Sequence, residues 1–233
     1  MGETVRIPTL SGEERFPIYC ATPSGEATAA IIVIPEIFGI NAGIRAKCDG
    51  WAAKGYVAAA PDIFWRFAEG DQLDPDVPEQ FQQALDNMGQ FDSEACIRDI
   101  EALIHHLSRE MGCAKVGLVG FCLGGFIAYT AAARTDIDAS VGYYGVSIDQ
   151  HLEEAHAIAN PLMLHIAGAD HFVTADAQAA IHRAFDDHPK VTLHDYPGLD
   201  HGFAAEIGNR RNDEGARLAD SRTEAFFAQH LAA

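Results

Sequence analysis

The fold is decided by one short stretch in the middle of the chain, Val116-Gly117-Leu118-Val119-Gly120-Phe121-Cys122-Leu123-Gly124-Gly125. Its first half is apolar and typical of a buried strand, and residues 126–131 after it are helical in pattern. Between them stands Gly-x-Cys-x-Gly, which predicts a sharp strand-to-helix turn with Cys122 at its apex. Glycines are expected on both sides of the apex, because a Cβ there would collide with neighbouring backbone.

Such a turn has the form of a nucleophile elbow, with cysteine where serine usually stands. A thiol at the first residue of a helix lies in the positive end of the helix dipole, which favours the thiolate that attacks carbonyl groups. The alternative interpretation is a small buried thiol in a glycine-rich turn, since free cysteines are commonly core residues. Motifs elsewhere in the chain decide between the two.

Composition limits the class of protein. The chain has 233 residues, of which 48% are hydrophobic, and a formal net charge of −18. We therefore expect one globular α/β domain over residues 1–233, and neither nucleic acid nor an anionic membrane as a partner. The oligomeric state is left open as a monomer or a small homo-oligomer.

The termini and the cysteines indicate a compartment. Residues 1–8 lack the apolar run of a signal peptide, and no apolar span long enough to cross a membrane follows. The five cysteines form no C-x-x-C pair, and their odd number leaves at least one unpaired. We expect a soluble cytoplasmic protein with reduced thiols, in which the four cysteines outside the elbow serve packing or lie incidentally at the surface. These four are Cys20, Cys48, Cys96 and Cys113.

From residue 29 onward, strand-like and helix-like segments alternate. The expected strands cover residues 29–34, 56–60, 115–119, 139–144, 162–168 and 191–196, and the expected helices 41–54, 94–107, 175–186 and 215–230. This alternation predicts a mostly parallel, doubly wound sheet flanked by helices, the α/β-hydrolase fold, with its site at the carboxyl ends of the strands. Residues 4–7 and 16–21 are expected to form an antiparallel edge hairpin, and residues 69–80 a long polar loop over the site.

A thiol nucleophile needs a base, and the base needs an orienting carboxylate. Asp170 directly follows the strand predicted at 162–168, and His201 follows the strand predicted at 191–196. The order Cys122, Asp170, His201 is the order of nucleophile, acid and histidine in α/β-hydrolases. Taken singly, Asp170 could be a helix N-cap and His201 a loop histidine, but their coincidence with the elbow predicts a catalytic triad.

Metal binding is a weaker hypothesis. His165, Asp170 and His171 could be imagined as ligands, but His165 lies inside a strand and no third histidine or cysteine is suitably spaced. We expect no metal and no cofactor.

The segment Ile34-Pro35-Glu36-Ile37-Phe38-Gly39 follows a buried strand, where an α/β-hydrolase supplies its second oxyanion-hole amide. The backbone N–H groups of Ile37 and Leu123 are the candidates for this hole. Glu36 beside them is unusual, because a carboxylate near a developing oxyanion would oppose it. It is either a functional group or a loop glutamate turned to solvent.

Taken together, these motifs resemble the dienelactone hydrolase (carboxymethylenebutenolidase) family across nearly the whole chain. The matching segments are Pro35–Asn41, Pro61–Phe64, Gly117–Gly125, Gly142–Gly145, Gly168–Val173 and His201–Phe203. The resemblance implies a Cys-His-Asp triad at Cys122, His201 and Asp170. It also implies that Glu36 pairs with Cys122 and governs when the thiol ionises.

The chain departs from the family pattern at the substrate carboxylate. The resemblance implies two arginines there, but this chain has Ala204-Ala205 at one position and no basic residue in 76–83 at the other. Arg66, Arg210 or Arg211 are the candidates to replace them. Arg66, Tyr144 and Phe203 are the expected substrate contacts.

The sequence therefore predicts a cofactor-independent hydrolase of activated esters or enol lactones, which works through an acyl-thioester on Cys122. Ile37 and Leu123 would hold the oxyanion, while His201 activates water and Asp170 fixes the imidazole tautomer. The alternative is a non-enzymatic thiol redox sensor or binding protein on the same fold, for which no second cysteine lies near the elbow in sequence.

Overall fold

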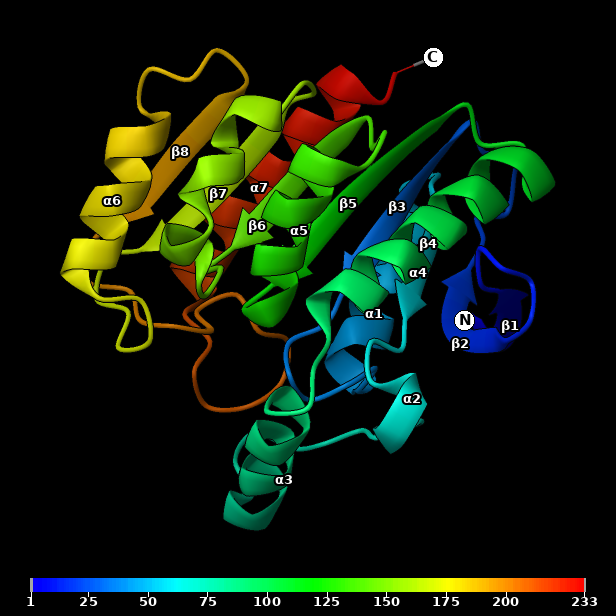
Figure 1. Cartoon of the computed structure of the whole chain (residues 1–233), viewed down its shortest axis with the longest axis horizontal. Helices are drawn as coiled ribbons and strands as arrows, with labels where there is room; N and C mark the ends of the chain where they lie inside the picture. The colour runs from blue at the N-terminus through cyan, green and yellow to red at the C-terminus, as the bar shows by residue number, and fades with distance from the viewer. Residues whose placement is uncertain (1, 233) are drawn as a thin grey trace.

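The computed structural model describes residues 2–232 and is built on one eight-stranded sheet with the order β1-β2-β4-β3-β5-β6-β7-β8 (Figure 1). Strands β3 to β8 run parallel, and β1 and β2 form the expected antiparallel hairpin at one edge. The predicted doubly wound, mostly parallel sheet is thereby confirmed. The strands are β1 (Glu3–Pro8), β2 (Arg15–Ala21), β3 (Ala29–Ile34), β4 (Val57–Pro61), β5 (Lys115–Phe121), β6 (Ala139–Tyr143), β7 (Leu162–Ala167) and β8 (Val191–Tyr196).

Helices cover both faces of the sheet. In Figure 1, α4, α5 and α6 lie in front of the sheet, while α1 and α7 lie behind it and meet through Trp51 and Phe227. The helices are α1 (Ala42–Ala53), α2 (Trp65–Ala68), α3 (Pro78–Met88), α4 (Ser93–His105), α5 (Leu123–Arg134), α6 (Ala175–Phe185) and α7 (Asp213–His230), with short helical turns at His106–Glu110, Ile148–Gln150 and Leu152–Ala157. No helix within residues 2–232 combines the length and the apolar character needed to span a bilayer.

The core lies where β3 pairs with β4 on one side and β5 on the other. All six residues of β3, Ala29–Ile34, are buried. A strand covered by helices on both faces cannot alternate polar and apolar residues, which explains the continuous apolar run in the sequence. Each fully buried isoleucine there contributes about 1.5–3 kcal/mol of hydrophobic stabilisation.

Two glycines of the elbow let the start of α5 press against the neighbouring strand. A Cβ on Gly120 would lie 1.8 Å from the carbonyl oxygen of Gly124, and a Cβ on Gly124 would lie 2.6 Å from the carbonyl oxygen of Ile34. No side chain fits at either place. This close approach brings the first turn of α5 beside the loop that follows β3.

The prediction of a polar loop over residues 69–80 is wrong for its last three residues, because α3 begins at Pro78. Proline is favourable at the first helical position, where its missing N–H is not needed. The preceding loop does pack where expected: Leu73 N donates to Phe38 O at 2.9 Å, and Gln72 forms a β-bridge with Gly39. The short helix α2 was not predicted.

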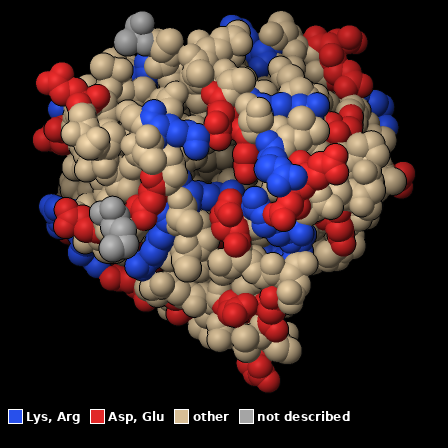
Figure 2. Space-filling view, turned by 180° about the vertical axis from the view of Figure 1, so that it is seen from behind, with Lys and Arg blue, Asp and Glu red and all other residues tan. Residues whose placement is uncertain are grey.

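The face that carries α1 and α7 has interspersed basic and acidic side chains around a central hollow (Figure 2). A cavity of about 150 Å³ lies between α1 and α7. Its charged lining residues are Lys47, Lys54, Glu206, Asp220 and Glu224. On this face, the acidic excess of the chain is therefore not gathered into one patch.

Candidate active site

Cys122 stands at the apex of the turn between β5 and α5 in a backbone conformation that few residues adopt, with φ 57° and ψ −113°. A non-glycine residue held at positive φ is strained, and the surrounding structure must impose the conformation. Here Cys122 N donates to Tyr143 O at 3.0 Å, and Cys122 O accepts from Gly125 N at 2.9 Å. The elbow predicted from the sequence thus has the geometry that presents a side chain at the sheet end.

Asp170 and His201 meet although they come from loops after different strands. His201 Nδ1 lies 2.8 Å from Asp170 Oδ2, and both side chains are 1% exposed. The other oxygen, Oδ1 of Asp170, accepts from the backbone N–H groups of Phe172 and Val173 at 2.8 and 3.1 Å. Asp170 therefore stabilises its own loop with Oδ1 and orients the imidazole of His201 with Oδ2.

The thiol of Cys122 and the imidazole of His201 influence each other directly. Burial lowers the pKa of His201, but the negative charge of Cys122 and the hydrogen bond to Asp170 outweigh it and raise the pKa to about 10. No hydrogen-bond partner within residues 2–232 occupies Nε2 of His201. The ring is thus fixed by Asp170 on one side and free on the side that bears on Cys122.

Glu36, which the family resemblance links to Cys122, is paired with Arg210 in this structure, and no hydrogen bond joins it to Cys122 within residues 2–232. Its Oε2 accepts a hydrogen bond from Arg210 Nη2 at 2.9 Å, and both side chains are largely buried. A buried carboxylate is costly without a cation, and Arg210 supplies one. Within the described chain, Glu36 Oε1 and Arg210 Nε have no hydrogen-bond partner, so each member of the pair keeps one free polar atom.

Tyr144 is a buried residue that packs against His201. It is 2% exposed, has a φ of 39°, and its ring lies 4.9 Å from that of His201. Burial raises the pKa of its phenol well above the usual value, and the charge of Glu36 adds to the effect, so the hydroxyl stays protonated. That hydroxyl finds no partner among the described residues. Phe203 packs on Tyr144 and is itself fully buried, so it supports the site rather than facing a ligand.

The two expected oxyanion amides are free to act. Among residues 2–232, the backbone N–H groups of Ile37 and Leu123 donate no hydrogen bond. Ile37 lies in the loop after β3, and Leu123 is the first residue of α5, which the elbow glycines press against that loop. An unused N–H at a helix N-terminus, with a second one in the adjacent loop, suits a developing negative charge.

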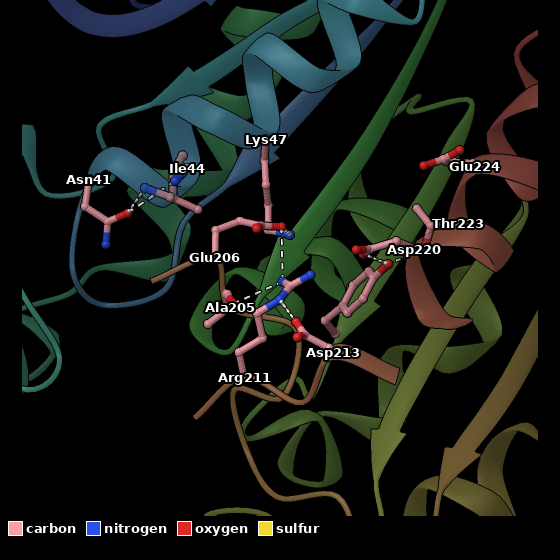
Figure 3. Close-up of polar contacts among 12 residues, drawn as sticks. Asn41, Ile44, Lys47, Ala205, Glu206, Arg211, Asp213, Asp220, Thr223 and Glu224 are labelled. Atoms are coloured by element: carbon pink, nitrogen blue, oxygen red, sulfur yellow. Dashed lines mark hydrogen bonds and ion pairs between the residues drawn. The ribbon is translucent and has the colours of Figure 1, made fainter. Parts of the chain in front are cut away.

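Of the three candidate arginines, only Arg210 reaches the site without a full set of partners. Arg66 is held by Asp99 through two hydrogen bonds of 2.6 and 3.0 Å, so its expected role as a substrate contact is not supported. Arg211 is engaged by Glu206 at 3.3 Å and Asp213 at 2.9 Å (Figure 3).

The imagined metal set does not assemble around His165. Both of its ring nitrogens are bonded, to Tyr196 and to Thr223. Asp170, His171 and Asp200 do offer ligand atoms within 4.8 Å of one another. However, Asp170 Oδ2 is engaged by His201, and His171 Nδ1 lies 2.8 Å from Asp200 Oδ1.

One aromatic side chain at the site was not predicted. Phe172 is 49% exposed, yet its ring lies 4.8 Å from that of His201. An exposed phenylalanine beside a buried histidine offers an apolar wall to a ligand. Its position two residues after Asp170 was the available signal.

The sheet order, the elbow and the buried Asp170–His201 pair define an α/β-hydrolase. The model of the dienelactone hydrolase family matches residues 16–231. The chain belongs to the dienelactone hydrolase family, and it is a carboxylic ester hydrolase of that type.

Relatives match over nearly the full chain. A candidate carboxymethylenebutenolidase of Azospirillum brasilense is 40% identical over 223 residues, covering 93% of this chain and 94% of the relative. The carboxymethylenebutenolidase of Pseudomonas putida is 34% identical over 227 residues, covering 97% and 96%. A crystal structure of a candidate dienelactone hydrolase from Klebsiella pneumoniae superposes with a TM-score of 0.83, at 26% identity and 98% coverage of both chains.

Proposed function

We propose that this enzyme cleaves activated esters and enol lactones through a thioester formed on Cys122. The observation that carries the proposal is the placement of a buried, carboxylate-oriented imidazole, His201, next to a thiol at a strained elbow. The pKa of His201, raised to about 10 by the charge of Cys122 and by Asp170, makes the imidazolium the form present at neutral pH, so His201 can donate a proton to the leaving group.

The first half of the reaction makes the acyl-enzyme. The sulfur of Cys122 attacks the carbonyl carbon, and the amides of Ile37 and Leu123 stabilise the oxyanion. The bond from carbon to the leaving oxygen then breaks, and the leaving enolate or phenolate takes the proton of the His201 imidazolium. In a lactone, this oxygen remains attached to the acyl chain.

The second half releases the product and restores the enzyme. Neutral His201 takes a proton from water, whose oxygen attacks the thioester carbon. Collapse of the tetrahedral intermediate expels the Cys122 thiolate and leaves a carboxylic acid. Asp170 keeps Nδ1 of His201 protonated throughout, so that Nε2 is the atom that exchanges protons.

Arg210 is the candidate to receive an anionic substrate group. It is the arginine whose contact in the site is a single carboxylate, Glu36, and its Nε has no other partner in the described chain. A substrate carboxylate would compete with Glu36 for this guanidinium. Phe172, which is 49% exposed beside His201, would pack on the apolar part of the substrate.

Turnover of p-nitrophenyl acetate tests the proposal, combined with mass spectrometry of the enzyme quenched during the reaction. We expect many turnovers per active site and an acetyl group on the peptide that contains Cys122. A single acetylation event without turnover would instead support the thiol sensor or binding protein. Turnover that persists in Cys122→Ala would place the chemistry elsewhere.

A further inference from the structure

Behind the sheet, six polar side chains form a continuous hydrogen-bonded chain that the reaction above does not use. It starts on α7, passes through β8 and β7 to Thr223 on α7, and then runs through β6 to end on α7. The contacts are Arg222 Nη1 to Tyr196 Oη at 3.1 Å, Tyr196 Oη to His165 Nδ1 at 2.8 Å, His165 Nε2 to Thr223 Oγ1 at 2.9 Å, Thr223 Oγ1 to Tyr143 Oη at 2.6 Å and Tyr143 Oη to Asp220 Oδ1 at 3.0 Å. Figure 3 shows Asp220 and Thr223 projecting from α7 toward the sheet.

The direction of the hydrogen bonds follows from counting protons, beginning at the acidic end. Tyr143 donates its single hydroxyl proton to Asp220, so it must accept from Thr223. Thr223 has then used its own single proton, so it must accept from His165. Nε2 of His165 therefore carries a hydrogen.

Counting protons from the other end, at Arg222, gives the same direction of hydrogen-bond donation. Burial lowers the pKa of His165 well below its usual value, and His194 and Arg222 lower it further, so the ring is neutral and Nδ1 accepts from the Tyr196 hydroxyl. Tyr196 can then accept from Arg222, which has only donors. The reverse direction would leave the Tyr196 proton without an acceptor. All five bonds are thus satisfied in one orientation, from a cation to an anion.

This hydrogen-bonded network of side chains is joined to the active site through backbone carbonyl groups of β6 and β7. Tyr143 O accepts the N–H of Cys122 at 3.0 Å, and His165 O accepts the N–H of Tyr144 at 2.8 Å. The ring of Tyr143 packs on Phe121, the residue before the nucleophile, with centroids 4.8 Å apart. Cys122 and Tyr144 are the two residues of the site with positive φ. Each donates its backbone N–H to a residue of the hydrogen-bonded side-chain network.

We infer that Thr223, His165 and Tyr143 are positioning residues for the nucleophile, and that they act as one hydrogen-bonded unit with His165 in the Nε2–H tautomer. The unit fixes Tyr143 from behind, and Tyr143 holds the amide of Cys122. Hydrogen-bonded networks of this kind rigidify a core when every member is satisfied. The inference rests on the proposed role of Cys122, but its tautomer does not.

The matched variants are Thr223→Val, which removes the hydroxyl but keeps the shape, and Thr223→Ser, which keeps the hydroxyl. Ser221→Ala on the exposed side of α7 is the control. We expect Thr223→Val to lower kcat for p-nitrophenyl acetate by about tenfold with KM changed less than about twofold, since small displacements of reacting groups reduce rate more than binding. Alkylation of Cys122 by iodoacetamide should slow in parallel. Thr223→Ser and Ser221→Ala should stay near wild type.

Histidine nitrogen NMR of the wild-type protein reads the tautomer directly and needs no variant. A neutral His165 with hydrogen on Nε2 supports the inference, and a hydrogen on Nδ1 overturns it. Wild-type kcat in Thr223→Val, or an equal loss in Thr223→Ser, overturns the positioning role. If Cys122→Ala retains full turnover, the proposed function fails instead, while the NMR result stands by itself.

Discussion

Arg210 and Glu36 form an ion pair of 2.9 Å across 174 residues of sequence, and they do so within the site that holds Cys122 and His201. The pair places one positive and one negative charge near the thiol, where either partner can be removed by substitution or engaged by substrate. Removal of the charge of Glu36 and binding of a substrate anion to Arg210 therefore both change the electrostatic potential at the sulfur of Cys122.

Glu36→Gln should shift the pH profile of Cys122 alkylation to lower pH. The change removes a negative charge near the thiol and frees the positive charge of Arg210, and both effects favour the thiolate. The measurement is the rate of iodoacetamide labelling at Cys122 against pH, followed by peptide mapping. Glu69→Gln, at a glutamate that pairs with Arg6 at the surface, is the control. Superimposable curves for Glu36→Gln and wild type would refute a role in thiol ionisation.

Cys122→Ala should lower the pKa of His201 from its value of about 10. Burial alone lowers this pKa, and the charge of Cys122 is the largest influence that raises it, so loss of the thiol leaves only Asp170 to oppose burial. A folded-state pKa above the unfolded value stabilises the fold below about pH 6.5, and this contribution disappears as pH rises through about 10. NMR titration of the His201 ring measures the shift. An unchanged midpoint in Cys122→Ala would show that the two groups are not coupled.

His201→Ala should reduce turnover by about two to four orders of magnitude, the usual contribution of a general base. Asp170→Asn should cost less, because it leaves the imidazole in place but can turn it to the wrong tautomer. His182→Ala is a matched control, because His182 also lies between two carboxylates, Asp186 and Asp195, but on the surface helix α6. Near-wild-type turnover in His201→Ala would mean that another base acts.

Arg210→Gln should weaken any preference for substrates that carry a carboxylate. A charged hydrogen bond of this kind contributes about 1.5–3 kcal/mol, or roughly a factor of ten to a hundred in kcat/KM. The comparison is kcat/KM for a dienelactone carboxylate and for its methyl ester in each variant. Arg66→Gln and Arg211→Gln should leave the ratio unchanged, since acidic partners already occupy both side chains. A ratio that falls only in one of these two variants would assign the contact to that arginine.

The leaving group should set the substrate range. A thiolate is a better leaving group than an alkoxide, so the adduct with an alkyl ester returns to starting material. Aryl esters, enol lactones and thioesters, whose leaving groups are as stable as the thiolate, should react. We expect kcat/KM for a phenyl ester to exceed that for the matching ethyl ester by a wide margin, with amides inert. Equal values for the two esters would argue against a thioester intermediate.

The positions of Cys122, Asp170 and His201 could be predicted because each follows a strand, and parallel strands end at one edge of a sheet. The end of a strand locates the residues that follow it directly, but it does not predict the path of a long loop beyond them. Arg210 lies in residues 204–212, which have no periodic pattern, so its approach to Glu36 could not be read from the sequence.

The helix α3 and the buried chain through His165 were missed for different reasons. Apolar residues recur at helical spacing from Phe81 to Met88, but the polar segment before Pro78 was extended across the helix start. His165 was excluded as a metal ligand because it lies in a strand, and the same fact shows why it needs partners. A histidine buried between helices and sheet must be hydrogen-bonded, yet its partners Tyr196 on β8 and Thr223 on α7 lie 31 and 58 residues away.

The positive φ of Cys122 also limits which chemistries this position can ever acquire. A residue in that conformation, with its amide tied to Tyr143 and glycines packed on both sides, accepts only a short side chain without branching at Cβ. Serine, cysteine and aspartate, whose carboxylate is a nucleophile in other enzymes, meet this condition, while threonine, also a nucleophile elsewhere, does not. A hydroxyl, a thiol or a carboxylate can therefore stand at this apex without a change of backbone, whereas a nucleophile on a branched Cβ requires the turn itself to be rebuilt.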